Sequence, residues 1–171
     1  SGLSVYLHFG CLSPLEVAEL RIARTAQNIR LFQNRTVLAH GQVGRHVRMR
    51  GQWFHAILGT ASIRQEEEAT IQKARELLTL VGLRRRVEDE LAKNLPYGDQ
   101  RRLEVARALA SDPKLLLLDE PTAGMNPGET RQMTDFISRL RRDLQLAILL
   151  LEPDMKGGMG VSERSTVLDY G

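Results

Sequence analysis

An apolar run that ends in two acids limits the possible folds of this chain more than any other feature. Residues 115–118 are four consecutive leucines between a turn at 111–113 and the pair Asp119 and Glu120. A run without polar alternation is typical of a parallel strand buried on both faces. A helical pattern over 127–142 follows, and then a second such apolar run, 146–151, which we expect to form a strand buried like the first. The succession of strand, helix and strand predicts an α/β fold with parallel strands.

Composition excludes several other classes of protein. The 171 residues are 42% hydrophobic and 26% charged, which is ordinary for a globular domain of this length. No apolar run approaches the roughly 18 to 20 residues of a membrane span. The single cysteine excludes an internal disulfide, and the four histidines lack zinc-ligand spacing. The net charge of +3 permits an anionic partner without requiring one.

The rest of the chain gives weaker local patterns. Residues 2–9 predict a strand, and Ser13 with Pro14 predicts the start of a helix that ends near Arg24. Residues 25–59 are too irregular to assign an element. Helices are predicted over 64–80, with Gly82 as the C-terminal cap, and over 99–110.

The acid pair suggests chemistry. In open parallel sheets the ligand lies beyond the carboxyl ends of the strands, and Asp119, Glu120 and Glu152 all follow predicted strands. A buried carboxylate needs a cationic or hydrogen-bonding partner, and magnesium is one such partner. In phosphoryl transfer the first acid would help to hold the metal, and the second would take a proton from, or orient, the attacking water. The alternative is that both acids simply cap the strand and its turn.

Four segments in order carry a resemblance to a known family. Residues 115–122 resemble the Walker B strand and catalytic Glu of ATP-binding cassette (ABC) ATPases, and residues 123–127 resemble the D-loop. Residues 95–109 are similar to the family signature and its helix, and residues 24–32 to the Q-loop region. Within the family, the sequence of residues 24–32, together with Tyr97-Gly98 and Asn126-Pro127, is most similar to that of ATP-binding subunits of branched-chain amino-acid importers.

The resemblance implies a fold and a set of partners. The fold is a P-loop NTPase-like α/β core with parallel strands and an α-helical subdomain. The Q-loop and helical subdomain would occupy about 25–95, and the signature helix, Walker B and following strands about 96–171. The implied cofactors are ATP and Mg²⁺. The implied partners are a second ABC ATPase subunit and membrane permease subunits, with the chain in the cytoplasm, peripheral on the inner face of the cell membrane.

The resemblance also implies roles for individual residues. Gln27 would lie near the magnesium and sense the membrane subunit. Gly98 would let the signature helix approach the γ-phosphate of a nucleotide held by a partner subunit, with Asp99 beside it. Asp119 would contribute to the metal site, and Glu120 would be the catalytic base.

Some family features are missing from the sequence. A Walker A loop needs Gly-Lys-Ser or Gly-Lys-Thr, and none of the four lysines follows a glycine. That loop precedes the Q-loop in the family, so we expect an N-terminally truncated chain. Pro153 stands where the switch histidine belongs, and Asp99, usually Gln in these importers, puts a negative charge where a phosphate should approach.

These departures lead us to expect that the chain alone does not hydrolyse ATP. One alternative is a non-catalytic, degenerate subunit that donates only its signature face to a complete partner. Another is a remnant without function. Arginine runs at 84–86 and 101–102 could contact phosphates, but such runs are usually solvated, and nucleic-acid binding is not expected.

Overall fold

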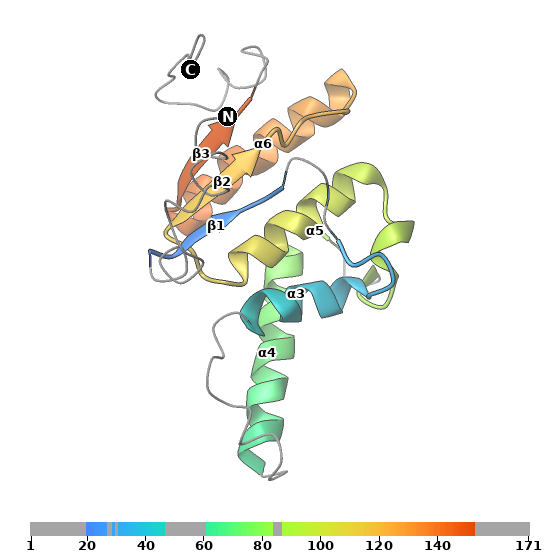
Figure 1. The fold of residues 1–171 in the computed structure, drawn as a ribbon, viewed down its shortest axis with the longest axis vertical. Helices are drawn as coiled ribbons and strands as arrows, with labels where there is room; N and C mark the ends of the chain where they lie inside the picture. The colour runs from blue at the N-terminus through green and yellow to red at the C-terminus, as the bar shows by residue number, and fades with distance from the viewer. Residues whose placement is uncertain (1–19, 27–28, 30, 47–60, 84–86, 153–171) are drawn as a thin grey trace, which may run out of the picture. The chain divides into compact units, whose positions relative to one another are not determined.

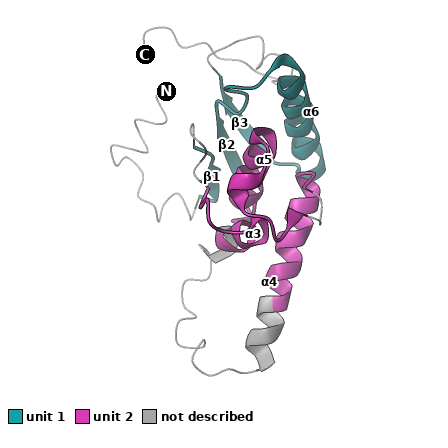
Figure 2. Cartoon of the chain, turned by 90° about the vertical axis from the view of Figure 1, so that its right-hand side faces the viewer, with its two compact units in different colours: residues 1–27, 113–171 teal, residues 28–112 magenta. Residues whose placement is uncertain are grey.

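The computed structural model describes residues 20–26, 29, 31–46, 61–83 and 87–152. The strand predicted over 2–9 and the start of the helix predicted from Ser13 lie outside these ranges. The chain forms two compact units, one of residues 1–27 with 113–171 and the other of residues 28–112 (Figure 2).

The first unit contains a three-stranded parallel sheet (Figure 1). Its strands are β1 (Ile22–Arg24), β2 (Leu115–Asp119) and β3 (Ala147–Leu151), in the order β1-β2-β3. Both neighbours pair with β2 in parallel, Ile22 opposite Leu115 and Asp119 opposite Leu151. The three central leucines of β2 are at most 1% exposed. The predicted parallel strand buried on both faces is therefore confirmed for β2.

Helix α6 (Pro127–Leu144) connects β2 to β3 and begins with a complete cap. The Asn126 side chain accepts hydrogen bonds from the amides of Gly128 and Glu129, and the Glu129 carboxylate accepts one from the Asn126 amide. This reciprocal arrangement satisfies donors that a helix start otherwise leaves unpaired. One face of α6 is buried through residues spaced by three or four, namely Met133, Phe136, Ile137 and Leu140.

The sheet corrects two sequence predictions. The prediction of a helix that ends near Arg24 is wrong at its end, because Ile22–Arg24 is a strand. These residues adopt the extended conformation because they pair with β2. The second apolar run was expected to be buried like the first, yet Leu149 of β3 is 39% exposed. Among the described strands β3 pairs only with β2, so it lies at an edge.

The second unit is helical. It contains α3 (Val37–His46), α4 (Ala61–Leu80), the short 3₁₀ helix η3 (Ala92–Asn94) and α5 (Tyr97–Leu109). Helices α4 and α5 confirm the predictions, whereas α3 lies in the stretch to which no element was assigned. A Cβ atom at Gly41 of α3 would lie 2.9 Å from the Ala74 Cβ of α4. The glycine therefore permits the close approach of these two helices.

The end of α4 forms the predicted glycine cap. Gly82 has a φ of +82°, its amide donates to the Thr79 carbonyl at 3.0 Å, and the Leu83 amide donates to the Leu78 carbonyl at 2.8 Å. This pair of bonds is the Schellman arrangement, which favours glycine. In the described part of the chain, no helix has both the length and the apolar character that a membrane crossing requires.

His40 anchors the segment that leads into α3. It is fully buried, and its Nε2 accepts a hydrogen bond from the Phe32 amide at 3.0 Å. Its Nδ1 lies 2.9 Å from the Thr36 carbonyl, so the ring fits as a neutral imidazole with the proton on Nδ1. Burial lowers the pKa of His40 below its ordinary value of 6.5, and this effect exceeds the opposing effect of the Thr36 bond.

Candidate functional site

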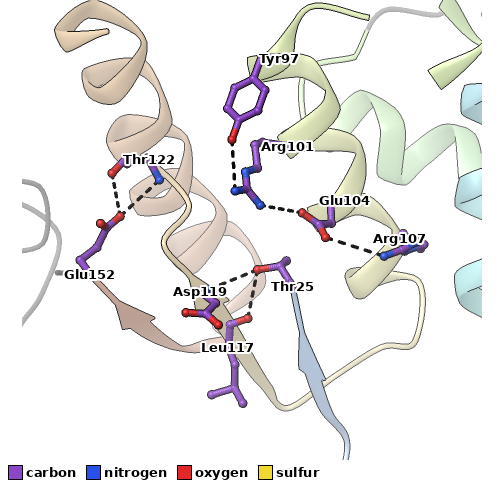
Figure 3. Close-up of polar contacts among 9 residues, drawn as sticks. All are labelled: Thr25, Tyr97, Arg101, Glu104, Arg107, Leu117, Asp119, Thr122 and Glu152. Atoms are coloured by element: carbon purple, nitrogen blue, oxygen red, sulfur yellow. Dashed lines mark hydrogen bonds and ion pairs between the residues drawn. The ribbon is translucent and has the colours of Figure 1, made fainter. Parts of the chain in front are cut away.

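Asp119 lies at the carboxyl end of β2 and is held by β1. The residue is 5% exposed, and its Oδ2 accepts a hydrogen bond from Nη2 of Arg24 at 2.7 Å. The Asp119 amide donates to the Thr25 hydroxyl at 3.4 Å, and that hydroxyl lies 3.5 Å from the Leu117 carbonyl (Figure 3). The cationic partner that a buried carboxylate requires is thus supplied by a guanidinium from the neighbouring strand.

Glu120 begins the turn after β2 in an unusual backbone conformation. Its φ is +46°, in the left-handed region, which costs a residue with a Cβ roughly 1–2 kcal/mol. Its amide donates to the Leu151 carbonyl at the end of β3, at 2.8 Å. Arg21, Asp112 and Gln145 also lie in the left-handed region, so the conformation by itself does not mark a functional residue.

Glu152 follows β3 at the same edge of the sheet. Its Oε1 accepts a hydrogen bond from the Thr122 hydroxyl at 2.8 Å and one from the Thr122 amide at 3.4 Å (Figure 3). The prediction that Asp119, Glu120 and Glu152 all lie at carboxyl ends of strands is confirmed.

The carboxylates described at this edge do not by themselves make a complete metal site. Among the residues that the structure describes, no group of three or more His, Cys, Asp or Glu side chains is arranged to hold a metal ion. Magnesium in nucleotide sites takes one or two carboxylates and completes its shell with phosphate oxygens and water. Asp119, the acid expected to hold the metal, could supply one such carboxylate beside its contact with Arg24, while Glu120 is expected to be the base.

The N-terminus of α5, in the second unit, is open. The N-cap residue Pro96 supplies no side-chain hydrogen bond. A Cβ at Gly98 would meet no heavy atom of the described residues within 4 Å, and the described glycines with positive φ are Gly82 and Gly124. Neither packing against the described part of the chain nor backbone conformation therefore requires glycine at position 98. The first turn of a helix favours anions, and the carboxylate of Asp99 lies in that turn.

One turn further along, α5 contains a buried ion pair. Nη1 of Arg101 lies 3.1 Å from Oε2 of Glu104, and the two side chains are 4% and 1% exposed. Nη2 of Arg101 donates to the Tyr97 hydroxyl at 3.3 Å, and its guanidinium lies 5.7 Å from the centre of that ring (Figure 3). Arg101 is thus part of the interior, which corrects the expectation that this arginine run is solvated.

Comparison with known proteins identifies the family. The model of the ABC transporter family matches residues 13–123, well over half of the chain.

The chain belongs to the ABC transporter family.

Two curated relatives are transport ATP-binding proteins. The "High-affinity branched-chain amino acid transport ATP-binding protein LivG" of Escherichia coli is 38% identical over 164 residues, which are 96% of this chain and 64% of LivG. The protein of the same description, BraF, of Pseudomonas aeruginosa is 35% identical over 156 residues, 91% of this chain and 61% of BraF. The chain therefore spans less than two thirds of the length of these relatives.

Solved ABC cassettes share the fold. The ADP conformation of the ATP-binding cassette MJ1267 superposes with a TM-score of 0.63 and 26% identity, over 82% of this chain and 54% of that one. The dimeric cassette MJ0796 bound to ADP and Pi gives a TM-score of 0.66 at 20% identity, over 88% and 61%. The predicted P-loop NTPase-like α/β fold is confirmed.

The residues expected from the ABC resemblance fall into three groups. Asp119 and Glu120 lie together at the end of β2, and Gly98 and Asp99 lie together at the start of α5. Gln27 lies outside the described residues, as does Pro153. The structure does not test the roles of any of these residues, which stay predictions.

Three contributors escaped the sequence patterns. Arg24 was assigned to a helix, so its pairing with Asp119 could not be foreseen. Thr25 and Thr122 bind their partners across about 90 and about 30 residues of chain, respectively. The sequence contains one signal for these contacts, the position of Glu152 at the end of an apolar run. A carboxylate there needs a hydrogen-bonding partner, but the spacing of residues does not indicate which residue that partner is.

Proposed function

We propose that this chain is the part of an ABC importer ATP-binding subunit that carries the signature helix and Walker B, from the branched-chain amino-acid class. The support is the identity with LivG and BraF over nearly the whole chain. The proposal includes a second ABC ATPase subunit and membrane permease subunits as partners, and a place in the cytoplasm, peripheral on the inner face of the membrane.

ATP and Mg²⁺ are the proposed cofactors. Bound magnesium neutralises phosphate charge. Asp119 would hold the ion directly or through water, with Gln27 as a further ligand. Glu120 would accept a proton from the attacking water or orient it. Arg24 keeps the Asp119 carboxylate at a fixed position.

The single observation that carries the proposal is the open environment of Gly98. Among the residues that the structure describes, a Cβ there meets no heavy atom within 4 Å. The glycine instead suits a ligand that approaches from outside the chain. The start of α5, with its helix dipole and amide donors, favours an anionic group such as the γ-phosphate of a nucleotide held by a partner subunit.

The chain by itself is proposed not to hydrolyse ATP, because its 171 residues contain no Gly-Lys-Ser or Gly-Lys-Thr. A second candidate is a non-catalytic subunit that donates only its signature face. The observation in its favour is Asp99, whose carboxylate lies in the first turn of α5, where a phosphate should approach.

A mixing experiment tests both candidates. Purified chain is added to LivG, and the rate of ATP hydrolysis is measured. We expect stimulation, and we expect Gly98→Val to abolish it without lowering the thermal stability of the chain, because a Cβ at this position meets no heavy atom of the described residues within 4 Å. Gln132→Ala, on an exposed position of α6, is the control and should stimulate like wild type.

Two results would contradict the proposal. If wild-type chain left the rate of ATP hydrolysis by LivG unchanged, the start of α5 would not act as a signature helix. The same conclusion would follow if Gly98→Val stimulated LivG as strongly as wild type. Turnover by the chain alone that Glu120→Gln abolishes would show that the expected inactivity is wrong and would favour an enzyme over the non-catalytic candidate.

A further inference from the structure

The turn that carries Glu120 is tied to the end of β3 on both sides. On one side, the Glu120 amide donates to the Leu151 carbonyl at 2.8 Å. On the other side, two residues later, the Thr122 hydroxyl and amide both donate to Oε1 of Glu152, at 2.8 Å and 3.4 Å (Figure 3). Consecutive residues of β3 and its end thus hold the two flanks of one short turn.

Glu120 needs this support because of its backbone. A φ of +46° is unfavourable for a residue with a Cβ, and such a conformation persists only where the surroundings determine it. Without contacts that fix the turn, the chain would relax toward a negative φ. That relaxation would move the carboxylate of Glu120 relative to Asp119, the preceding residue.

We propose that Glu152 is a positioning residue that, through Thr122, holds Glu120 in its left-handed conformation. This pair of residues is called the Glu152 clasp. The proposal rests on the proposed function in taking Glu120 as the base. Two donors of one residue converge on a single carboxylate oxygen, and hydrogen bonds to an ionised acceptor are stronger than neutral ones.

Amide hydrogen exchange of the 171-residue chain, followed residue by residue by NMR, tests the clasp. The reporters are the amides of Glu120 and Thr122, and Leu117 in the middle of β2 is the reference. Thr122→Val removes the hydroxyl at nearly constant shape, and Glu152→Ala removes the acceptor. We expect exchange at Glu120 to accelerate roughly tenfold in both variants, the size of one lost hydrogen bond, while Leu117 stays at the wild-type rate.

Conservative variants complete the design. Thr122→Ser keeps the hydroxyl and should restore wild-type exchange, and Glu152→Gln keeps an acceptor oxygen and should give an intermediate rate. Thr134→Val makes the same chemical change on α6 and should leave Glu120 unaffected. If Thr122→Val or Glu152→Ala does not fold, the difference in exchange rate at Glu120 between Glu152→Gln and wild type tests the proposal instead.

Unchanged exchange at Glu120 in the clasp variants would overturn the proposal. Equal acceleration at Glu120 and Leu117 would also overturn it, because the contacts would then stabilise the sheet as a whole. The measurement uses neither nucleotide nor partner, so its failure is distinguishable from a failure of the mixing experiment with LivG.

Discussion

The end of β2 and the start of α5 both carry residues expected to face a nucleotide, yet they are built in opposite ways. At the end of β2, Asp119 is bound by Arg24, and the Glu120 amide is bound by the end of β3. At the start of α5, the N-cap side chain makes no hydrogen bond, and no heavy atom of the described residues lies within 4 Å of a Cβ placed at Gly98. The first region has its geometry fixed by its own chain, while the second leaves room for another molecule.

This difference has a physical reason. A buried carboxylate or a left-handed residue is unfavourable unless neighbours compensate for it, so such groups carry their partners with them. A helix N-terminus close to solvent is satisfied by water until an anion replaces it. Mutations at the end of β2 should therefore change stability, whereas mutations at the start of α5 should change assembly.

The largest expected effect on stability comes from loss of the Arg24–Asp119 pair. Arg24→Met removes the cation and leaves the Asp119 carboxylate, whose side chain is 7% exposed, without it. We expect the free energy of unfolding to fall by about 2–3 kcal/mol, below the range for fully buried pairs because Arg24 is partly exposed. Urea denaturation followed by circular dichroism measures the change.

The matched control is an exposed ion pair. Lys73 and Glu76 lie 3.3 Å apart with side chains 54% and 56% exposed, so Lys73→Met should change stability by less than about 0.5 kcal/mol. An Arg24→Met variant no less stable than Lys73→Met would show that the Arg24–Asp119 pair does not stabilise the end of β2.

Much of the fold could be predicted because its patterns are local. Four leucines specify β2, and Asn126 with Pro127 specifies the start of α6. Gly82 marks the end of α4. Strand β1 could not be predicted, because three residues carry no period and their state comes from β2, more than 90 residues away. Helix α3 was missed because Gly41 suggests a loop until its contact with α4 is known.

The candidate site divides in the same way. The positions of Asp119 and Glu120 could be predicted, since residues that follow a parallel strand lie at its carboxyl edge. Their partners could not, because Arg24 and Leu151 reach them only through strand pairing. Nothing in the spacing of Gly98 indicates whether a side chain there would meet the rest of the chain.

The next effect is a loss of stability in acid, and it comes from His40 in the unit that contains α5. Burial lowers the pKa of His40, and the charges of Arg107 and Arg35 add to that effect. In the unfolded chain the His40 ring takes up a proton near pH 6.5, while in the folded chain the ring stays neutral to lower pH. The free energy of unfolding should therefore fall as pH drops below 6.5, until the lower pKa of the folded state is reached.

Urea denaturation over this pH range measures the effect, with His40→Gln as the comparison. Glutamine offers one acceptor and one donor and does not titrate, so part of the pH dependence should disappear. An identical pH dependence in wild type and His40→Gln would show that the ring does not carry the effect.

A smaller effect tests the strain at Glu120. Glu120→Gly and Glu120→Ala both remove the carboxylate, but glycine accepts a φ of +46° without steric cost. We expect the glycine variant to be about 1 kcal/mol more stable than the alanine variant, the left-handed penalty less the extra entropy of glycine in the unfolded chain. Thermal and urea unfolding of the two proteins measure the difference. An alanine variant that equals or exceeds the glycine variant would mean that the turn is relaxed.

The smallest effect on stability should accompany a gain in assembly. Asp99 lies in the first turn of α5, where its charge interacts favourably with the helix dipole, so Asp99→Gln should lower stability by about 0.5 kcal/mol. The same charge repels an approaching phosphate, so the variant should stimulate LivG more strongly than wild type in the mixing experiment. Glu129→Gln makes the equivalent change in the first turn of α6 and should leave stimulation unchanged. Stimulation that is weaker in Asp99→Gln would mean that Asp99 helps rather than opposes the partner, and the start of α5 would then resemble the end of β2 in supplying a contact of its own.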